Sequence, residues 1–100
     1  MSIKEKITQA LIESVKKHLN LQHYKVFYFG SQVNGDATSR SDFDVGIDAG
    51  KKISSETKLD IQQDMDNLPV MQKIEIVDFS QVDSEFKKVA LKNIEVIYER

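Results

Sequence analysis

Cysteine is absent from this sequence of 100 residues, and proline occurs only once, at Pro69. Without cysteine the chain has no disulfide framework, no thiolate nucleophile and no zinc site built on sulfur. No apolar run approaches the length of a membrane span. The first residues carry charges throughout, which is not the pattern of a signal peptide. We therefore expect a cytoplasmic protein.

An excess of charge of one sign is missing as well. The 14 basic and 16 acidic residues give a net charge of −2, so no overall basic field exists to hold nucleic acid non-specifically. We expect no direct binding of nucleic acid and no membrane partner. The 40% hydrophobic and 30% charged residues are typical of a globular protein. A chain of this length without repeats or linkers suits one domain over residues 1–100.

Periodicity predicts the first elements. Apolar residues at every fourth position indicate an amphipathic helix over residues 2–19, with Ser2 and Glu5 as its capping box. Residues 25–30, KVFYFG, form a short apolar run typical of a strand buried on both faces. The small and polar residues 30–41 predict a loop that has room for one helical turn.

The second half predicts two further helices and another strand. Residues 54–68 suit a helix that Pro69 ends, residues 73–79 a strand, and the residues after a Ser84 cap a last helix. The inward positions expected for these two helices are Leu59, Ile61, Met65, Leu68, Phe86, Val89 and Ala90. The final EVIYER fits either a helix end or an edge strand. This order predicts an α/β (α+β) fold, with a small mixed sheet and helices packed on one face.

Two aspartates share one face of the strand predicted for residues 41–48, SDFDVGID. Asp42 and Asp44 are two positions apart and so project on the same side. Like charges held close raise each other's pKa and cost stability unless a positive charge lies between them. Oxygen ligands suit Mg²⁺ or Mn²⁺ rather than zinc. Taken alone, the pair also fits the solvent face of an edge strand.

A Gly-Ser turn precedes the aspartates. Gly30 lets the backbone approach a ligand closely, Ser31 offers a hydroxyl, and Gly35 is suited to closing the turn. Free N–H groups at such a turn form an anion site. A phosphate-binding turn beside paired carboxylates is what nucleoside triphosphate chemistry requires.

Such chemistry usually involves a third carboxylate, which completes a second metal site or deprotonates the attacking hydroxyl. Glu75 and Asp78 are the candidates in residues 73–79. If Ile74 and Ile76 face the helices, Glu75 falls on the side of Asp42 and Asp44. We expect Glu75 to be the third acid and Asp78 to be a capping or loop residue, although Glu75 also fits a plain exposed strand position.

Gly30-Ser31, ten residues, and then Asp42-Phe43-Asp44 resemble the GS-x10-D-x-D signature of the DNA polymerase β-like nucleotidyltransferase superfamily. The short chain resembles its minimal nucleotidyltransferase (MNT) branch along nearly its whole length. The resemblance implies a nucleotidyltransferase fold. Asp42, Asp44 and Glu75 would be the catalytic residues that hold Mg²⁺ in a two-metal site. Gly30 and Ser31, together with Ser41, would bind the phosphates of ATP.

MNT proteins are commonly encoded beside a helical HEPN protein and act as its antitoxin, some by transferring AMP to a tyrosine of the HEPN ribonuclease. The resemblance thus implies a protein adenylyltransferase that uses Mg-ATP and a HEPN toxin as partner. The alternative is a non-catalytic nucleotide-binding or steric subunit that neutralises its partner by contact. Transfer to a small molecule ranks lower, because the chain shows no second domain. Two departures from the family pattern are Gln32 and Asn34 in place of arginines, and Glu75 where aspartate is more frequent.

Overall fold

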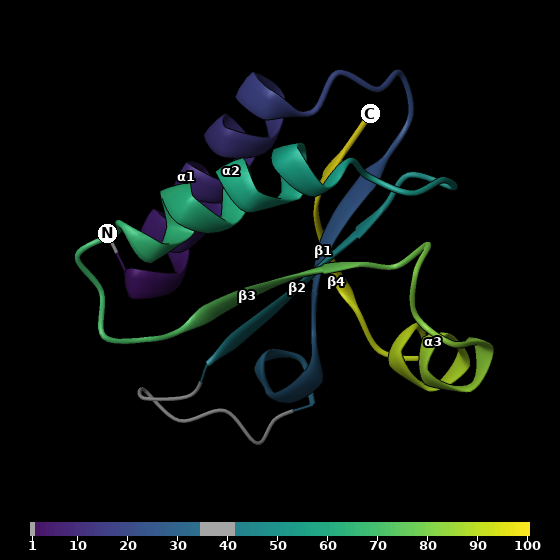
Figure 1. Ribbon diagram of the computed structural model, residues 1–100. Coiled ribbons are helices and arrows are strands. Elements are labelled where there is room, and N and C mark those ends of the chain that lie inside the picture. The colour runs from purple at the N-terminus through teal and green to yellow at the C-terminus, as the bar shows by residue number, and fades with distance from the viewer. Residues whose placement is uncertain (1, 35–41) are drawn as a thin grey trace.

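The computed structural model describes residues 2–34 and 42–100 (Figure 1). These residues form one sheet of four strands in the order β3-β2-β1-β4. β1 runs antiparallel to both β2 and β4, whereas β2 and β3 are parallel. The elements are α1 (Ile3–His18), β1 (Lys25–Phe29), the 3-10 turn η1 (Gly30–Gln32), β2 (Phe43–Asp48), α2 (Ser55–Asp66), β3 (Ile74–Asp78), α3 (Ser84–Ala90) and β4 (Glu95–Glu99). The mixed α/β fold expected from the sequence is confirmed, and the last residues form an edge strand.

α1 and α2 pack against one face of the sheet and against each other (Figure 1). Ser2 caps α1 by accepting a hydrogen bond from the N–H of Glu5, and Ser54 caps α2 in the same way through Thr57. The alternate residues of the strands that face these helices form the main core. Its members are Ile7, Leu11, Val15, Leu19, Tyr24, Val26, Tyr28, Phe43, Val45, Ile47, Ile53, Ile61, Met65, Ile74 and Ile76.

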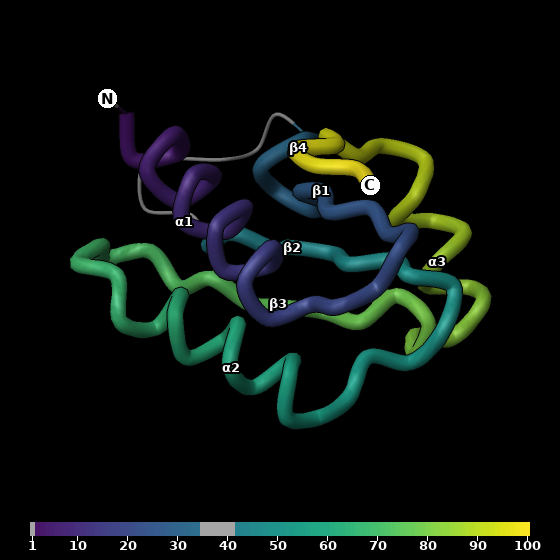
Figure 2. Tube along the Cα trace, turned by 90° about the horizontal axis from the view of Figure 1, so that it is seen from above, coloured from purple at the N-terminus to yellow at the C-terminus, as the bar shows by residue number. Residues whose placement is uncertain are grey.

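The other face of the sheet carries a smaller aromatic cluster of Phe27, Phe29 and Phe79. Residues at the end of α3 and just after it, including Ala90 and Leu91, pack against this cluster. β1 is therefore buried on both faces, as its apolar run indicated. The expectation that the helices pack on one face holds for α1 and α2 only, because Ala90 and Leu91 bring α3 against the aromatic cluster on the opposite face. Figure 2 shows α3 at the far end of the molecule from the start of α1.

Three details of the helices differ from the sequence prediction. The N-cap of α3 is Asp83 and not Ser84, because the Asp83 carboxylate accepts hydrogen bonds from the first-turn N–H groups of Glu85 and Phe86. Phe86 and Val89, expected inward, are 44% and 64% exposed. Ala90 and Leu91 pack against the aromatic cluster instead, and the Phe86 ring contacts only the edge of that cluster. Leu59 is 55% exposed because it lies on the outer side of α2, away from the core residues Ile61 and Met65.

The outer edge of β3 is closed by a side chain of α2. The Gln62 side-chain nitrogen donates to the carbonyl of Ile74 at 2.7 Å, and its oxygen accepts from the N–H of Ile76 at 3.0 Å. This amide group takes the place of a neighbouring strand, so these backbone groups are satisfied. No helix in the described part of the chain is both long enough and apolar enough to cross a membrane.

Candidate functional site

The Gly30 backbone lies directly against the carboxylate of Asp44. Phe29, the last residue of β1, is paired with Asp44 on β2, and Gly30 follows with a φ of +74°. A Cβ built on Gly30 would lie only 2.6 Å from the Asp44 Oδ2 atom. Both the backbone conformation and this close approach require glycine, so β1 ends in a turn shaped around the carboxylate.

The turn is closed on itself and tied to the start of β2. The N–H groups of Val33 and Asn34 both donate to the carbonyl of Gly30 at 3.1 Å. The Gln32 side-chain amide donates to the carbonyl of Asp42 at 3.2 Å. The Gly-Ser turn and the aspartates, separated by ten residues in the sequence, are therefore neighbours in the fold.

Register places the third acid beside the aspartates. Asp44 and Glu75 are direct partners in the parallel ladder of β2 and β3, so their side chains project on the same face. Asp42 stands just before β2, and its Oδ1 accepts a hydrogen bond from the N–H of Lys73 at 3.2 Å. Glu75 and Asp42 are exposed, whereas Asp44 is half-buried.

Asp78, the last residue of β3, makes hydrogen bonds that hold the fold together. It is buried, and its carboxylate accepts hydrogen bonds from the N–H of Ile53 at 2.8 Å and from the N–H and hydroxyl of Ser80 at 2.9 and 2.8 Å. These bonds join the segment before α2 to the turn that follows β3. Asp78 is a structural residue in this arrangement.

The electrostatics of the three acids favour a cation. Burial raises the pKa of Asp44, and the negative charges of Glu75 and Asp42 raise this pKa further. In the described part of the chain no cause acts in the opposite direction on Asp44. A divalent cation bound by carboxylate oxygens would remove this cost, and oxygen ligands are those that Mg²⁺ prefers.

The acids do not amount to a preassembled metal site. Among residues 2–34 and 42–100, no group of three His, Cys, Asp or Glu side chains is arranged to hold a metal ion. Asp42, Asp44 and Glu75 share a face and an electrostatic field, so their donor chemistry fits Mg²⁺. A small rotation of exposed side chains, or the phosphate oxygens of a nucleotide, would have to complete the coordination.

A pocket of about 310 Å³ opens beside Gly30 and Asp44. Its opposite wall comes from α3 and the segment after it, a contribution that no motif in the sequence indicated. Asn93 connects the two walls, because its side-chain nitrogen donates to the carbonyl of Val33 at 2.9 Å and to the side-chain oxygen of Asn34 at 2.7 Å. The pocket is lined by Phe29, Gly30, Asn34, Asp44, Phe86, Val89, Ala90 and Asn93.

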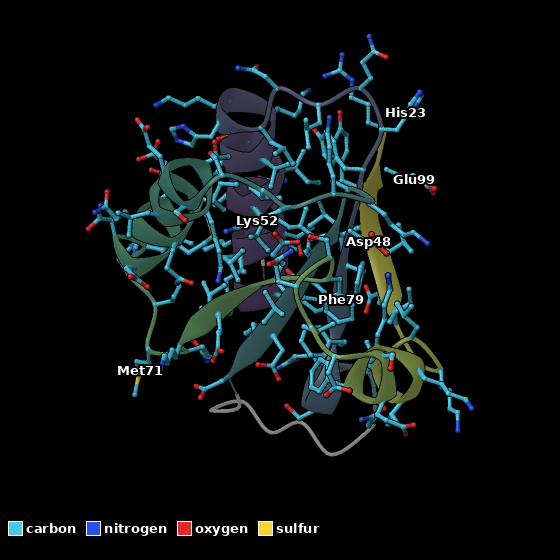
Figure 3. The ribbon with its side chains drawn as sticks, turned by 45° about the vertical axis from the view of Figure 1, so that its right-hand side comes forward. His23, Asp48, Lys52, Met71, Phe79 and Glu99 are labelled. Carbon is cyan, nitrogen blue, oxygen red and sulfur yellow. The ribbon has the colours of Figure 1, made fainter. Side chains whose placement is uncertain are left out.

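Two residues expected at the turn are not described, and the two histidines of the chain lie in other parts of the fold. Ser41 and Gly35 fall outside the described residues. His18 contacts Asp64 of α2, with its Nε2 3.0 Å from the carboxylate, and so belongs to the contact between the two helices. His23 is exposed and lies near the surface at the start of β1 (Figure 3).

Comparison with known families agrees with this geometry. The sequence matches the family described as "Polymerase beta, Nucleotidyltransferase" over residues 9–100. The chain therefore belongs to the polymerase β nucleotidyltransferase family. No curated protein matches it significantly.

Solved structures with the same fold include three toxin–antitoxin complexes. A toxin–antitoxin structure with AMP-PNP has a TM-score of 0.73 at 13% identity, covering 91% of this chain and 72% of that chain. The structure of the tri-AMPylated Shewanella oneidensis HEPN toxin in complex with MNT antitoxin has a TM-score of 0.71 at 11% sequence identity. The match covers 96% of this chain and 72% of that chain. A toxin–antitoxin MntA-HepT structure gives 0.68 at 11% identity, covering 94% and 71%. At such low identity the likeness is one of fold.

Proposed function

We propose that this chain is a protein adenylyltransferase that uses Mg-ATP, and that it acts as the antitoxin of a HEPN toxin by transferring AMP to a hydroxyl of that partner. The observation that carries the proposal is the contact between the Gly30 turn and the Asp44 carboxylate, whose pKa is raised by burial and by two neighbouring acids. Similar folds in complexes of MNT antitoxins with HEPN toxins support the choice of partner.

Each residue has a proposed role. The Gly30-Ser31 turn holds the β- and γ-phosphates, with Ser41 as a further phosphate contact, and Asp42, Asp44 and Glu75 hold Mg²⁺. Bound Mg²⁺ neutralises phosphate charge and stabilises the departing pyrophosphate. Asp44 and Glu75 lie in the paired strands β2 and β3, whose ladder fixes their backbone, and Asp42 stands just before β2.

The proposed reaction is a single displacement at the α-phosphorus of ATP. The acceptor hydroxyl oxygen forms a bond to this phosphorus, and the bond from the phosphorus to the bridging oxygen of the β-phosphate breaks, which releases pyrophosphate. The hydroxyl proton passes to a carboxylate. Glu75 is placed for this role, because it is exposed and stands opposite Asp44. In this proposal the partner supplies the acceptor hydroxyl, and the reaction takes place in the cytoplasm.

Two observations favour a second candidate function. The described acids do not form a ready-made metal site, and Gln32 and Asn34 stand where many relatives carry arginines. Both features suit a non-catalytic subunit that binds nucleotide or simply covers its toxin. Catalysis requires the carboxylates of Asp42 and Asp44, whereas neutralisation by contact does not. Replacing these two aspartates therefore separates the two functions experimentally.

The test is co-expression of the chain with the protein encoded beside it, followed by intact-mass measurement of that partner. We expect a mass increase of one or more AMP groups, absent when Asp42→Asn and Asp44→Asn are combined. Glu13→Gln, an exchange at an α1 residue remote from the turn, is a matched control that should leave modification intact. Neutralisation that persists in the double variant without any mass change would establish the contact-only function instead.

A further inference from the structure

Two exposed apolar side chains of α3 lie at the pocket beside the Gly30 turn. Phe86 and Val89 are 44% and 64% exposed and stand three positions apart, on one side of the helix. Both line the same pocket as Gly30 and Asp44. Large apolar side chains exposed at the mouth of a polar site usually mark a surface that a ligand or partner covers.

The ring of Phe86 is held in place by two aromatic neighbours. Its centroid lies 6.0 Å from that of Phe29 at an interplanar angle of 89°, and 6.0 Å from that of Phe79 at 49°. Phe79 is fully buried and lies between the sheet and α3 (Figure 3). Phe86 is therefore an oriented ring on a rigid support rather than a loose surface side chain.

The pocket changes character from one wall to the other. Gly30 and Asp44 supply the polar wall, which the proposed function assigns to phosphate and metal, and α3 supplies the apolar wall. The side-chain nitrogen of Asn93 donates hydrogen bonds to Val33 and Asn34. The side-chain oxygen of Asn93 remains as an acceptor at the pocket edge. A volume of about 310 Å³ is at the low end for ligand sites and suits one ring system rather than a protein segment.

We propose that Phe86 and Val89 form the binding surface for the nucleobase of the triphosphate, which stacks on Phe86 while the phosphates reach the Gly30 turn. This inference rests on the proposed function and adds the residues that distinguish a nucleotide from a bare polyphosphate. Aromatic rings bind bases by stacking irrespective of the base, so the surface favours nucleotides as a class and the Asn93 oxygen favours a base with an amino group.

The experiment compares ATP with inorganic tripolyphosphate, which has the phosphates but no base. Binding of each to the full chain with Mg²⁺ is measured by titration calorimetry. Wild type should bind ATP more tightly than tripolyphosphate. Phe86→Ala and Val89→Ser should each weaken ATP binding, by roughly tenfold for the ring, and leave tripolyphosphate binding unchanged. Val96→Ser is the matched control, because Val96 of β4 is 45% exposed and does not line the pocket.

The possible outcomes separate the two proposals. Equal affinity of wild type for ATP and tripolyphosphate would overturn the base-binding role while leaving the phosphate site intact. If Val89→Ser lost partner binding but kept its ATP affinity, the base-binding role would also be overturned. The surface formed by Phe86 and Val89 would then belong to the partner contact. If wild type binds neither compound, the proposed function itself fails. Val89→Ser keeps the test valid if Phe86→Ala does not fold, because Val89 is mostly exposed.

Discussion

The ring of Phe27 occupies the space that a side chain at position 46 would need. A Cβ built on Gly46 would overlap the Cε2 atom of Phe27 and would lie 2.7 Å from the Cε1 atom of Phe79. Both rings are fully buried and lie edge to face, with their centroids 4.8 Å apart. Glycine at this position lets both rings approach the backbone of β2, and these rings belong to the cluster against which α3 packs.

Gly46→Ala should destabilise the fold by about 1–3 kcal/mol, because the added methyl overpacks a rigid aromatic cluster. Chemical denaturation of wild type and variant measures this difference. Gly50→Asn is the control: Gly50 has a φ of +72° and open space around its Cβ position, and asparagine tolerates that conformation. A variant Gly46→Ala as stable as wild type would show that the cluster yields easily.

Gly30→Ala should abolish adenylyl transfer while the protein still folds. The new methyl would press on the Asp44 carboxylate, which is the movable end of a side chain, and the positive φ would cost about 1 kcal/mol. Circular dichroism checks that Gly30→Ala folds. Mg-ATP titration and the intact mass of the co-expressed partner check the loss of ATP binding and of adenylyl transfer. Retained ATP binding and transfer in a folded Gly30→Ala protein would contradict the proposed role of the turn.

Asp44→Asn should raise the melting temperature at neutral pH in the absence of Mg²⁺. The folded state raises the pKa of Asp44, mainly by burial and then through the charges of Glu75 and Asp42. The folded state therefore binds this proton more tightly than the unfolded state, and stability is lost as pH rises from the ordinary aspartate pKa through the folded value. A neutral amide avoids this loss.

Calorimetric scans from about pH 4 to about pH 7 check that prediction. The difference in melting temperature between Asp44→Asn and wild type should shrink as pH falls toward the ordinary aspartate pKa of about 3.9. Saturating Mg²⁺ with ATP should stabilise wild type more than the variant. A variant that melts below wild type at neutral pH would mean that the charge of Asp44 is already compensated in the folded protein.

Ser14 of α1 and Asp64 of α2 form a hydrogen bond between the two helices. This bond should stabilise the folded state mainly while the Asp64 carboxylate is charged. The buried Ser14 hydroxyl donates to the Asp64 Oδ2 at 2.7 Å, and His18 Nε2 lies 3.0 Å from the same atom. The hydrogen bond from Ser14 lowers the pKa of Asp64, as do the bond and charge of His18. The stabilisation is therefore present above the unfolded pKa and is lost as pH falls through the folded value.

Asp64→Asn should cost about 1 kcal/mol at neutral pH, because a carboxylate that is partly exposed gains only modestly from its partners. Denaturant unfolding at about pH 7 and about pH 3 measures the change, and the two proteins should become similar in acid. Lys16→Gln is a surface control on α1. A difference that stays constant with pH would indicate that packing, and not charge, holds the two helices together at this point.

Gln62→Ala should destabilise the chain by about 1–3 kcal/mol, because two backbone groups of β3 lose their partners. Gln63→Ala is the matched control, as Gln63 is the next residue on α2 and is exposed. Unfolding in urea compares the two variants. Equal stabilities of Gln62→Ala and Gln63→Ala would mean that water satisfies the β3 edge as well as the side chain does.

Patterns local to the sequence predicted most of the fold. The four-residue stripe of α1, the alternation of β2 and the run of β1 each follow from burial of one or two faces. α3 was harder, because its short apolar pattern does not reveal which face of the sheet it covers. Asp83 and Ser84 are both good caps, and only the direction of the Asp83 carboxylate decides between them. The last strand depended on pairing with β1, which no local pattern encodes.

The candidate site is partly predictable, because local alternation along a strand shows which face each residue lies on. Alternation placed Glu75 on the side of Asp44, and the ladder of β2 and β3 confirms that placement. The roles of Asp42, Asp44, Glu75, Gly30, Ser31 and Ser41 stay predictions. Asn93 and the Phe86 wall were missed, because they meet the Gly30 turn only through the packing of α3 against the aromatic cluster.

The closed edge of β3 also bears on how the protein behaves when concentrated. An incoming peptide strand that grew a fibril from β3 would first have to displace the Gln62 amide from Ile74 and Ile76. β4, which is paired with β1 on one side, has no such guard from the described residues. Addition of a strand from another molecule at β3 would therefore cost both Gln62 hydrogen bonds, which makes this edge of the sheet a poor starting point for ordered aggregation.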